Sequence, residues 1–325
     1  SVEWDVRIGG NSVSSEFRRR LIDITVSDRP GQASDSCSLT LGDSDADIDL
    51  DIEGVEIEVD LNGTTVFEGF VDKARSTGSR GGGRLVPVTA RGHDDRGKAK
   101  QPLAFHVDDA PLGDFLGKAA KLAGYELVID QELAGEMRDY WSADYESFSD
   151  VGQRLAREIG GTFKLRKKKA VLVKRGTTML NTVHGICGPG GNVISWDLSP
   201  FSGRPAFAKA EARWFDRKTA KFETKEIDID LGAETEAVNR VRMPMGDGDQ
   251  ADLRINGRKG QSKRDRGGGR VELDLTPEAQ VEGLFVLSGA QPGVDGGWRI
   301  AGVDHKANRS GGASTPLELK EPGAE

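Results

Sequence analysis

The sequence predicts a mainly β protein with an inserted α/β unit: two small antiparallel β-barrel (tube-like) domains and, between them, a helix-and-hairpin domain. Two observations predict this class. Apolar and polar residues alternate before about residue 100 and after about residue 190, whereas apolar residues between these regions recur at helical spacing. The 43 glycines among the 325 residues divide the alternating regions into short segments, as turns do. We therefore place the domains at 1–100, 101–178 and 179–325.

The first domain is predicted from its strands and turns. Strands are expected over 48–52 and 55–61, and Gly54 between them shifts the alternation as a bulge or bend does. Asn62-Gly63 is a strong signal for a two-residue hairpin turn. The run RGGGR at 80–84 predicts another turn before the next strand. These elements are typical of a small antiparallel barrel or sandwich.

The helices of the middle domain have recognisable ends. A first helix is expected to open at Asp109-Ala110-Pro111 and to end at Gly124. A second is expected to begin at Ser147, with an acidic residue three positions later, and to stop at Gly160. A hairpin follows it. The expected core residues are Phe148, Val151 and Leu155 on the second helix and Trp298 in a C-terminal strand.

The third domain returns to strand-like alternation. The run RGGGR occurs a second time, at 266–270, and again precedes a strand, which hints that the two β-domains are similar; a five-residue glycine turn also recurs by chance. The predicted strands are VISWDLS, AFAKAEARWFD, KFETKEIDIDL, GRVELDL, LFVLSGA and WRIAGVDHKA.

Charge and cysteine content restrict the function classes. The 45 Lys and Arg residues against 53 Asp and Glu residues give a formal charge of −8, which disfavours electrostatic binding of nucleic acid or of an anionic membrane.

The two cysteines, Cys37 and Cys187, lie too far apart for a metal-ligand motif, and we expect reduced, buried thiols. The sequence shows neither a signal peptide nor an apolar run of membrane-spanning length. We expect a soluble protein made in the cytoplasm, with no membrane contact and no sequence-specific nucleic-acid binding.

Two acidic runs resemble calcium loops without meeting their requirements. In the ladder from Asp43 to Asp51, Ile48 and Gly54 stand where a calcium loop needs glycine and glutamate. The run around Asp247 fails the same test. We interpret the ladder as a solvated strand face and the second run as a turn, and we expect no metal site.

No catalytic motif is present. The sequence contains no nucleophile elbow, zinc-protease helix or phosphate-binding loop, and Asp304-His305 has no nucleophile spaced to join it. A pair of carboxylates of the glycosidase kind is not excluded by counting. We expect a protein without catalytic or cofactor-binding residues, in which Asp304 and His305 are structural.

A basic cluster lies at the tip of the predicted hairpin. Its four residues are Arg166, Lys167, Lys168 and Lys169. No aromatic residue is interleaved to stack a base, so the cluster is interpreted as a solvated turn or as a contact with an acidic partner surface.

Three segments carry a resemblance to a known family. They are VSDRPGQASDSCSLTLGD (26–43), with a D-x-x-G-x-x-S-D run, ESFSDVGQRLAREIGGTFKLRKKKAVLVKRG (146–176) and LSGAQPGVDGGWRIAGVDHKANRSGGASTPLELK (287–320). In this order they resemble the phage late control D proteins, the baseplate or tail hub of contractile tails, which are related to the hub part of VgrG-type proteins. The basic hairpin tip departs from the shorter turn common there, and the chain stops just past the last strand, which implies a separate spike protein.

The resemblance implies a structural role in a virion. It implies a homotrimer in the tail baseplate, assembled in the host cytoplasm, that joins the sixfold tail tube to the threefold central spike. The implied partners are the tail tube protein and the spike protein, with the tape-measure protein and baseplate wedge proteins as further candidates. The alternatives are a hub of a type VI-like or other contractile injection system, a tail-associated cell-wall hydrolase, and a carbohydrate-binding β-sandwich, for which 6% aromatic residues supply little stacking surface.

Overall fold

The computed structural model confirms a mainly β fold with few helices. It describes residues 2–12, 20–29, 34–93, 98–175, 181–200, 209–216, 221–228, 238–240, 268–310 and 312–320, with only the backbone described in 209–216, 221–228 and 238–240. Within these ranges, no helix has the length and apolar character that a membrane span requires.

Strands from both ends of the chain form one large sheet. Among the described residues it has fourteen strands, in the order β15-β19-β22-β21-β3-β4-β8-β6-β5-β1-β2, with β14 paired to β20, β20 to β21, and β7 to β8. Its strands before the helical region are β1 (Trp4–Ile8), β2 (Asn11–Ser12), β3 (Leu21–Asp28), β4 (Ser36–Gly42), β5 (Glu56–Leu61), β6 (Thr64–Ala74), β7 (Thr77–Ser79) and β8 (Gly83–Arg91). Those after it are β14 (Thr182–Ile186), β15 (Val193–Ser199), β19 (Gly268–Asp274), β20 (Leu284–Ser288), β21 (Gly296–Asn308) and β22 (Ala313–Lys320).

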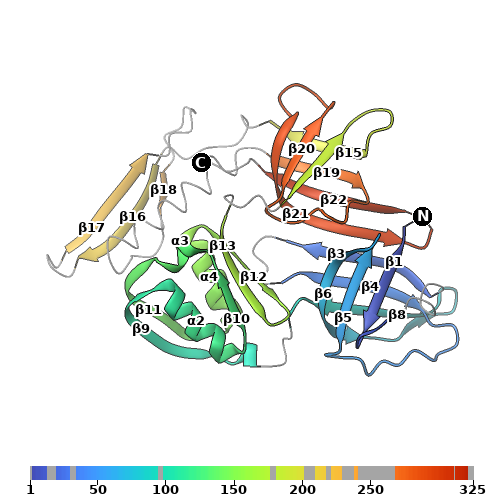
Figure 1. Ribbon diagram of the computed structural model, residues 1–325, viewed down its shortest axis with the longest axis horizontal. Helices are drawn as coiled ribbons and strands as arrows, with labels where there is room; N and C mark the ends of the chain where they lie inside the picture. Colours follow the sequence, from blue (N-terminus) through green and yellow to red (C-terminus); the bar gives the residue numbers. More distant parts are fainter. Residues whose placement is uncertain are drawn as a thin grey trace.

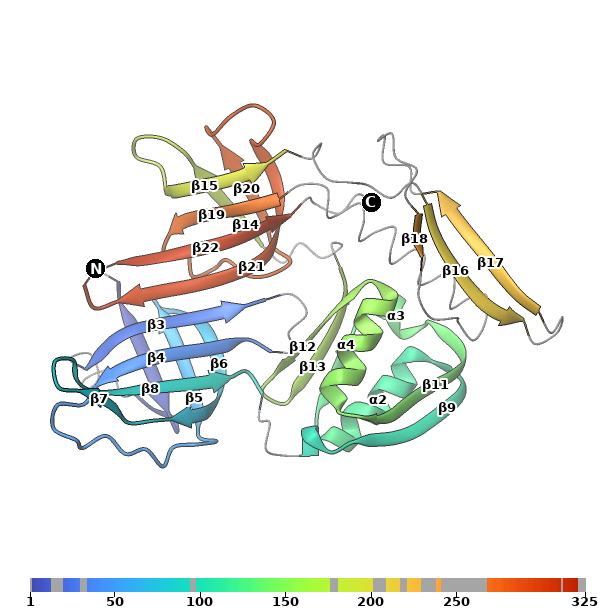
Figure 2. The ribbon, with the colours of Figure 1, turned by 180° about the vertical axis from the view of Figure 1, so that it is seen from behind.

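One strand pair joins the two β-regions. β21 runs antiparallel to β3, from Val303 opposite Asp28 to Asn308 opposite Asp23. Figures 1 and 2 show these strands side by side where the N-terminal and C-terminal strands meet. The buried apolar residues still form separate clusters on the two sides of this pair. Residues far apart in the sequence are therefore held in one sheet over two cores.

The hairpin predicted at Asn62-Gly63 is confirmed. Asn62 and Gly63 have φ angles of 49° and 78°, and they join β5 to β6. Two positive φ angles define the turn type whose twist matches that of an antiparallel pair. Asparagine and glycine adopt this conformation with little strain, which explains why the dipeptide predicts the turn.

The strand predicted over 48–52 is wrong. Asp43 accepts hydrogen bonds from the backbone N–H groups of Asp47 and Ile48, and Asp49 accepts one from Asp51. Aspartate side chains that bind nearby backbone N–H groups compete with strand pairing. The acidic ladder is consequently an irregular segment, and the next strand begins at Glu56.

The middle region places two helices between two small sheets. α2 (Leu112–Ala123) and α4 (Phe148–Ile159) contact strands of both sheets, and Figure 2 shows the helices between them. One sheet has the order β10-β13-β12 and the other pairs β11 with β9. The remaining elements are η1 (Lys98–Lys100), β9 (Leu103–Pro111), β10 (Glu126–Ile129), α3 (Gln131–Ala134), β11 (Met137–Glu146), β12 (Gly161–Arg166) and β13 (Lys169–Lys174).

The second predicted helix is confirmed at both ends. The Ser147 hydroxyl accepts a hydrogen bond from the N–H of Asp150, and Gly160 ends α4 with a left-handed φ of 71°. Phe148, Val151 and Leu155 are fully buried in the core of this region. The hairpin β12–β13 follows, as expected.

The predicted start of the first helix is wrong. Asp109 belongs to β9, and α2 begins at Leu112 with Pro111 in the capping position and no capping side chain. The N–H of Leu112 instead donates to the carbonyl of Glu136, the residue before β11. This bond, next to the pairing of β9 with β11, satisfies one of the N–H groups that the start of a helix leaves without an intrahelical partner.

The strands of the C-terminal region have nearly the same residue bounds as the predicted segments. Three of them, β16 (Lys209–Asp216), β17 (Lys221–Asp228) and β18 (Val238–Arg240), form a separate sheet in the order β17-β16-β18.

The predicted core residue Trp298 is buried, and its indole N–H donates to the carbonyl of Val294 at 2.8 Å. The acidic run around Asp247 lies outside the described residues. Closure of each β-region into a barrel, and the domain boundaries, stay predictions.

Candidate functional site

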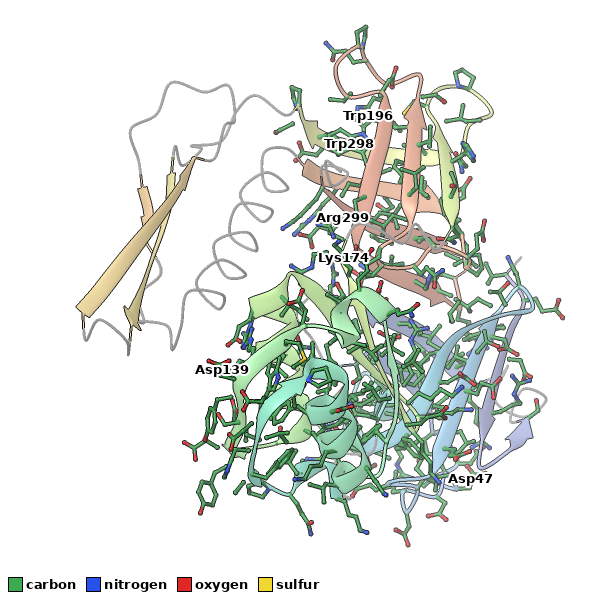
Figure 3. The ribbon with its side chains drawn as sticks, turned by 60° about the vertical axis from the view of Figure 1, so that its left-hand side comes forward. Asp47, Asp139, Lys174, Trp196, Trp298 and Arg299 are labelled. Carbon is green, nitrogen blue, oxygen red and sulfur yellow. The ribbon has the colours of Figure 1, made fainter. Side chains whose placement is uncertain are left out.

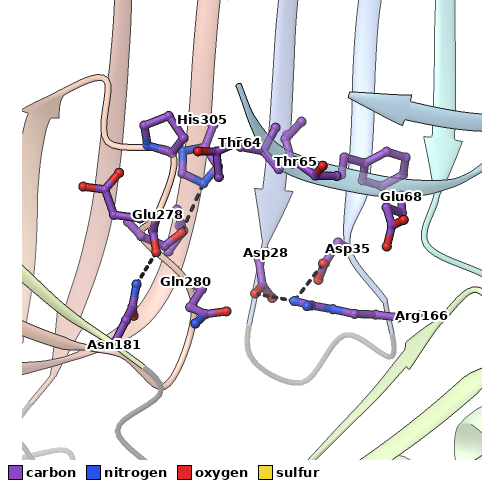
Figure 4. A pocket seen from close by; sticks show the side chains of 16 residues that line it. Asp28, Asp35, Thr64, Thr65, Glu68, Arg166, Asn181, Glu278, Gln280 and His305 are labelled. Carbon is purple, nitrogen blue, oxygen red and sulfur yellow. Dashed lines mark hydrogen bonds and ion pairs between the residues drawn. The ribbon is translucent and has the colours of Figure 1, made fainter. Parts of the chain in front are cut away.

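A cavity of about 510 Å³ lies where the three regions of the chain meet (Figure 4). Strand β3, the start of β6, the hairpin tip and the C-terminal strands each contribute side chains. Its lining residues are Val26, Asp28, Asp35, Thr64, Thr65, Val66, Phe67, Glu68, Arg166, Asn181, Pro277, Glu278, Ala279, Gln280, Val303 and His305.

Two cations of β12 face two carboxylates of the first β-region. The Lys164 ammonium donates to Asp28 Oδ1 at 2.5 Å and to the carbonyl of Arg29 at 2.9 Å, and it lies 3.4 Å from Asp35 Oδ1. The Arg166 guanidinium lies 3.4 Å from Asp35 Oδ2 and 4.0 Å from Asp28 Oδ2, as Figure 4 shows. The hairpin is therefore bound to the ends of β3 and β4 by a cluster of four charges.

Asp35 has an unusual protonation equilibrium. Burial, and after it the neighbouring Asp28 carboxylate, raise its pKa to about 6 against the opposing effect of Arg166 and Lys164. Burial has this direction because a carboxylate loses hydration when it leaves water.

The tip of the hairpin also contacts the first β-region. The backbone N–H of Lys167 donates to the carbonyl of Gly92 at 2.8 Å, and its ammonium pairs with Glu68 at 2.8 Å. The hydrogen bond to Glu68 raises the pKa of Lys167. For Arg166 and Lys167, the acidic surface thus belongs to the same chain. Lys168 and Lys169 are exposed.

A second polar contact joins the hairpin to the C-terminal strands. Thr162 donates to Glu282 Oε1 at 3.1 Å, and the same oxygen accepts from Arg299 at 3.1 Å. Glu282 and Arg299 are 6% and 7% exposed, so their ion pair is largely desolvated. Figure 3 shows Arg299 at the boundary between the C-terminal strands and the helical region. The hairpin thus contacts both β-regions.

Asp304 and His305 have structural partners. Asp304 pairs with Arg29 across the β21–β3 junction. His305 Nε2 lies 3.2 Å from the carbonyl of Ala279, and Nδ1 lies 3.3 Å from the hydroxyl of Thr315. Because a carbonyl only accepts, Nε2 carries the proton and Nδ1 accepts from Thr315. Burial lowers the pKa of His305 to about 4, so the ring is neutral at pH 7.

The other candidate chemistry is sparse in the described part of the chain. Cys37 is a buried free thiol whose pKa burial raises to about 12, and Cys187 is a half-buried free thiol. Within the described ranges, no group of three or more His, Cys, Asp or Glu side chains is placed to hold a metal ion.

Solved structures match the chain over its whole length. The prophage MuSo2 43 kDa tail protein from Shewanella oneidensis superposes with a TM-score of 0.76 at 15% identity, covering 99% of both chains. The tail protein from Neisseria meningitidis MC58 gives a TM-score of 0.73 at 16% identity, covering 99% of this chain and 97% of that one. The chain has the fold of these tail proteins.

The tail-protein fold is also found in a secretion-system component. The E. coli c3393 protein, described as a type VI secretion component with structural similarity to the T4 tail proteins gp27 and gp5, gives a TM-score of 0.57 at 10% identity, covering 100% of this chain and 77% of that one. At the level of the fold, these neighbours confirm the resemblance to phage hub proteins that the sequence indicates. A scan against protein-family models and a search of curated proteins found no match.

The charged cluster was only partly visible in the sequence. The basic hairpin tip stood out, but Lys164 within the strand and the buried Glu282–Arg299 pair did not. Asp28 and Asp35 are the two aspartates of the D-x-x-G-x-x-S-D run. That spacing is the one signal that pointed to them, and it did not indicate that the hairpin would bind there.

Proposed function

We propose that this protein is a structural baseplate hub of a phage contractile tail, a trimeric adaptor between the sixfold tail tube and the threefold central spike. The observation that carries the proposal is the full-length match to the MuSo2 43 kDa tail protein, with 99% of both chains covered. A match of this extent includes the helical region as well as both β-regions.

The arrangement of the two β-regions supports an adaptor role. A spike with threefold symmetry meets a tube with sixfold symmetry only through a component that has both symmetries. Three chains with two similar domains each supply six such domains. Pairing of β3 with β21 fixes the two β-regions of one chain in a single sheet. On this proposal the tube protein binds the ring of six domains, the spike binds its other face, and tape-measure and wedge proteins are further partners in the virion.

The exposed end of the hairpin is a proposed partner contact. Arg166 and Lys167 bind carboxylates of their own chain, whereas Lys168 and Lys169 are exposed at the turn. We assign these two lysines to an acidic partner surface, because exposed charges of one sign steer a partner of the opposite sign.

Native mass spectrometry and electron cryo-microscopy of the assembled tail test the adaptor proposal. We expect a trimer there, with a ring of six similar β-domains; a monomer of the isolated chain is compatible with the proposal, because the spike can complete the ring. A dimer or tetramer as the stable assembly, or a trimer without pseudo-sixfold symmetry, contradicts the proposal.

A hub of another contractile injection system is a second candidate. The Francisella PdpA-VgrG complex contains a chain that matches with a TM-score of 0.60 at 10% identity, over 98% of this chain and 52% of that one. Co-purification with a phage tube protein, or instead with a secretion tube protein, separates the two.

The proposed role makes and breaks no bond. A zymogram on purified peptidoglycan tests this against a cell-wall hydrolase, and a cleared band that follows the purified protein contradicts a purely structural role.

A further inference from the structure

The Asp28 and Asp35 carboxyl groups lie close together at a buried contact between two regions of the chain. Asp28 ends β3 and Asp35 precedes β4, next to the last residue pair between these strands, Ser27 opposite Ser36. Their side chains are 14% and 12% exposed. Both face Lys164 and Arg166 of the docked hairpin, and Figure 4 shows Arg166 beside the two carboxylates.

The two cations compensate the two carboxylates unequally. The Lys164 side chain is 11% exposed, but its single ammonium is shared: it lies 2.5 Å from Asp28 and 3.4 Å from Asp35. The other cation near Asp35, Arg166 at 3.4 Å, has a side chain that is 52% exposed. Water screens an exposed cation much more than a buried one. The second negative charge of the pair is therefore the poorly compensated one, and a proton is the simplest species to neutralise it.

We propose that the Asp28–Asp35 pair is a proton-binding site through which acidification tightens the docking of the β12–β13 hairpin onto the first β-region. The inference concerns the isolated chain and is independent of the proposed hub function. The ligand is a proton taken from solvent. It is held between the two carboxyl groups, with Asp35 donating to Asp28 while Asp28 still accepts from Lys164.

The size of the effect follows from the two environments of Asp35. In the docked state its pKa is about 6, and in an undocked state, exposed to water, it has the ordinary value of an aspartate. The docked state therefore binds the proton over a pH range in which the undocked state does not. By linkage, the ratio of docked to undocked chains rises about tenfold between pH 7.5 and pH 5.

The other polar and charged groups near the Asp28–Asp35 pair have partners of their own, so the proton remains assigned to this pair. Lys167 and Glu68 form an ion pair at the exposed tip, and Arg29 pairs with Asp304 and lies 3.6 Å from Glu318. His93 bonds Ser34, beside Asp35, at 2.7 Å.

His305 titrates in the opposite sense but belongs to a different contact. It also lines the cavity, and the Asp28 charge acts on it. Its hydrogen-bond partners, Ala279 and Thr315, both lie in the C-terminal region. Protonation of His305 therefore accompanies opening of that region, whereas protonation of the aspartate pair accompanies hairpin docking.

Hydrogen exchange of the Lys167 amide tests the proposal directly. This N–H donates to the carbonyl of Gly92, so it exchanges when the hairpin leaves the first β-region. After correction for the intrinsic exchange rate, its protection in the wild type should rise about tenfold from pH 7.5 to pH 5. In Asp35→Asn, which mimics the protonated carboxyl, protection should be high at pH 7.5 and should not change with pH.

A control variant and a second measurement complete the experiment. Asp72→Asn removes an aspartate that pairs with Arg91 at 3.5 Å and is 41% exposed, and it should keep the wild-type pH dependence. Carboxyl-carbon NMR of the wild type, which needs no variant to fold, should show one aspartate with a titration midpoint near pH 6. Protection that is flat or falls on acidification, a pH slope retained in Asp35→Asn, or only midpoints below about 4.5 would each overturn the proposal.

Discussion

Replacing Gly152 with alanine should destabilise the protein, although alanine is the better helix former. Gly152 is buried within α4. A Cβ atom added there would lie 2.6 Å from Cδ1 of Phe163, with two other ring carbons closer still. Phe163 is 1% exposed, and its ring packs edge-on against Phe148 at a centroid distance of 5.6 Å. The ring therefore has little room to move away from an added methyl group.

The two opposing effects have known magnitudes. Alanine is favoured over glycine in a helix interior by about 1 kcal/mol. Overpacking a buried site costs about 1–3 kcal/mol. We expect Gly152→Ala to lower the free energy of unfolding by up to about 2 kcal/mol.

Gly117 provides the matched control. It lies inside α2, and an added Cβ there would have no atom within 4 Å outside its own helix. Gly117→Ala should therefore raise the free energy of unfolding by about 0.5–1 kcal/mol.

Urea unfolding of the two variants and the wild type, followed by tryptophan fluorescence and circular dichroism, gives both differences. The packing of Gly152 against Phe163 is refuted if Gly152→Ala is as stable as Gly117→Ala.

Three further substitutions have defined outcomes. Leu155→Ala removes a fully buried side chain from the middle core and should lower the free energy of unfolding by about 2–5 kcal/mol in urea; an unchanged midpoint contradicts the burial of this helix face. Lys168→Glu at the exposed turn should change the melting temperature little, since the free-energy effect is below about 0.5 kcal/mol; a large fall would mean that the turn is packed. The unfolded chain protonates His305 below about pH 6.5, whereas the folded chain holds it neutral down to about pH 4, so this residue weakens folding as the pH falls through that window. His305→Gln should therefore gain stability relative to the wild type between pH 6.5 and pH 4, measured by urea unfolding at each pH; a constant difference contradicts the buried neutral ring.

Elements set by local interactions were predictable from the sequence. α4 carries its own signals: a capping serine, an apolar stripe and a terminal glycine. The Asn62-Gly63 turn depends on the backbone preferences of its own two residues. In both cases the signals that fix where the element begins and ends lie within a few positions along the chain.

Elements that depend on distant partners were mispredicted or missed. β9 and β11 form because residues 103–111 pair with residues 137–146. The strand predicted at 48–52 failed for a local reason instead, because nearby aspartate side chains bind its backbone N–H groups and periodicity does not reveal this competition. Periodicity records which residues are apolar and does not show which segment will pair with which.

The sequence by itself determined a mainly β chain with a helical insertion, and the order of its segments indicated a phage hub fold. Only the tertiary structure decided that β3 and β21, more than 250 residues apart, share one sheet. It also decided that Lys164 and Arg166 meet Asp28 and Asp35 in a largely buried cluster. The physical reason is that local propensity acts between neighbours in the chain, whereas desolvation and the pKa of a carboxyl group depend on every charge that folding brings near it.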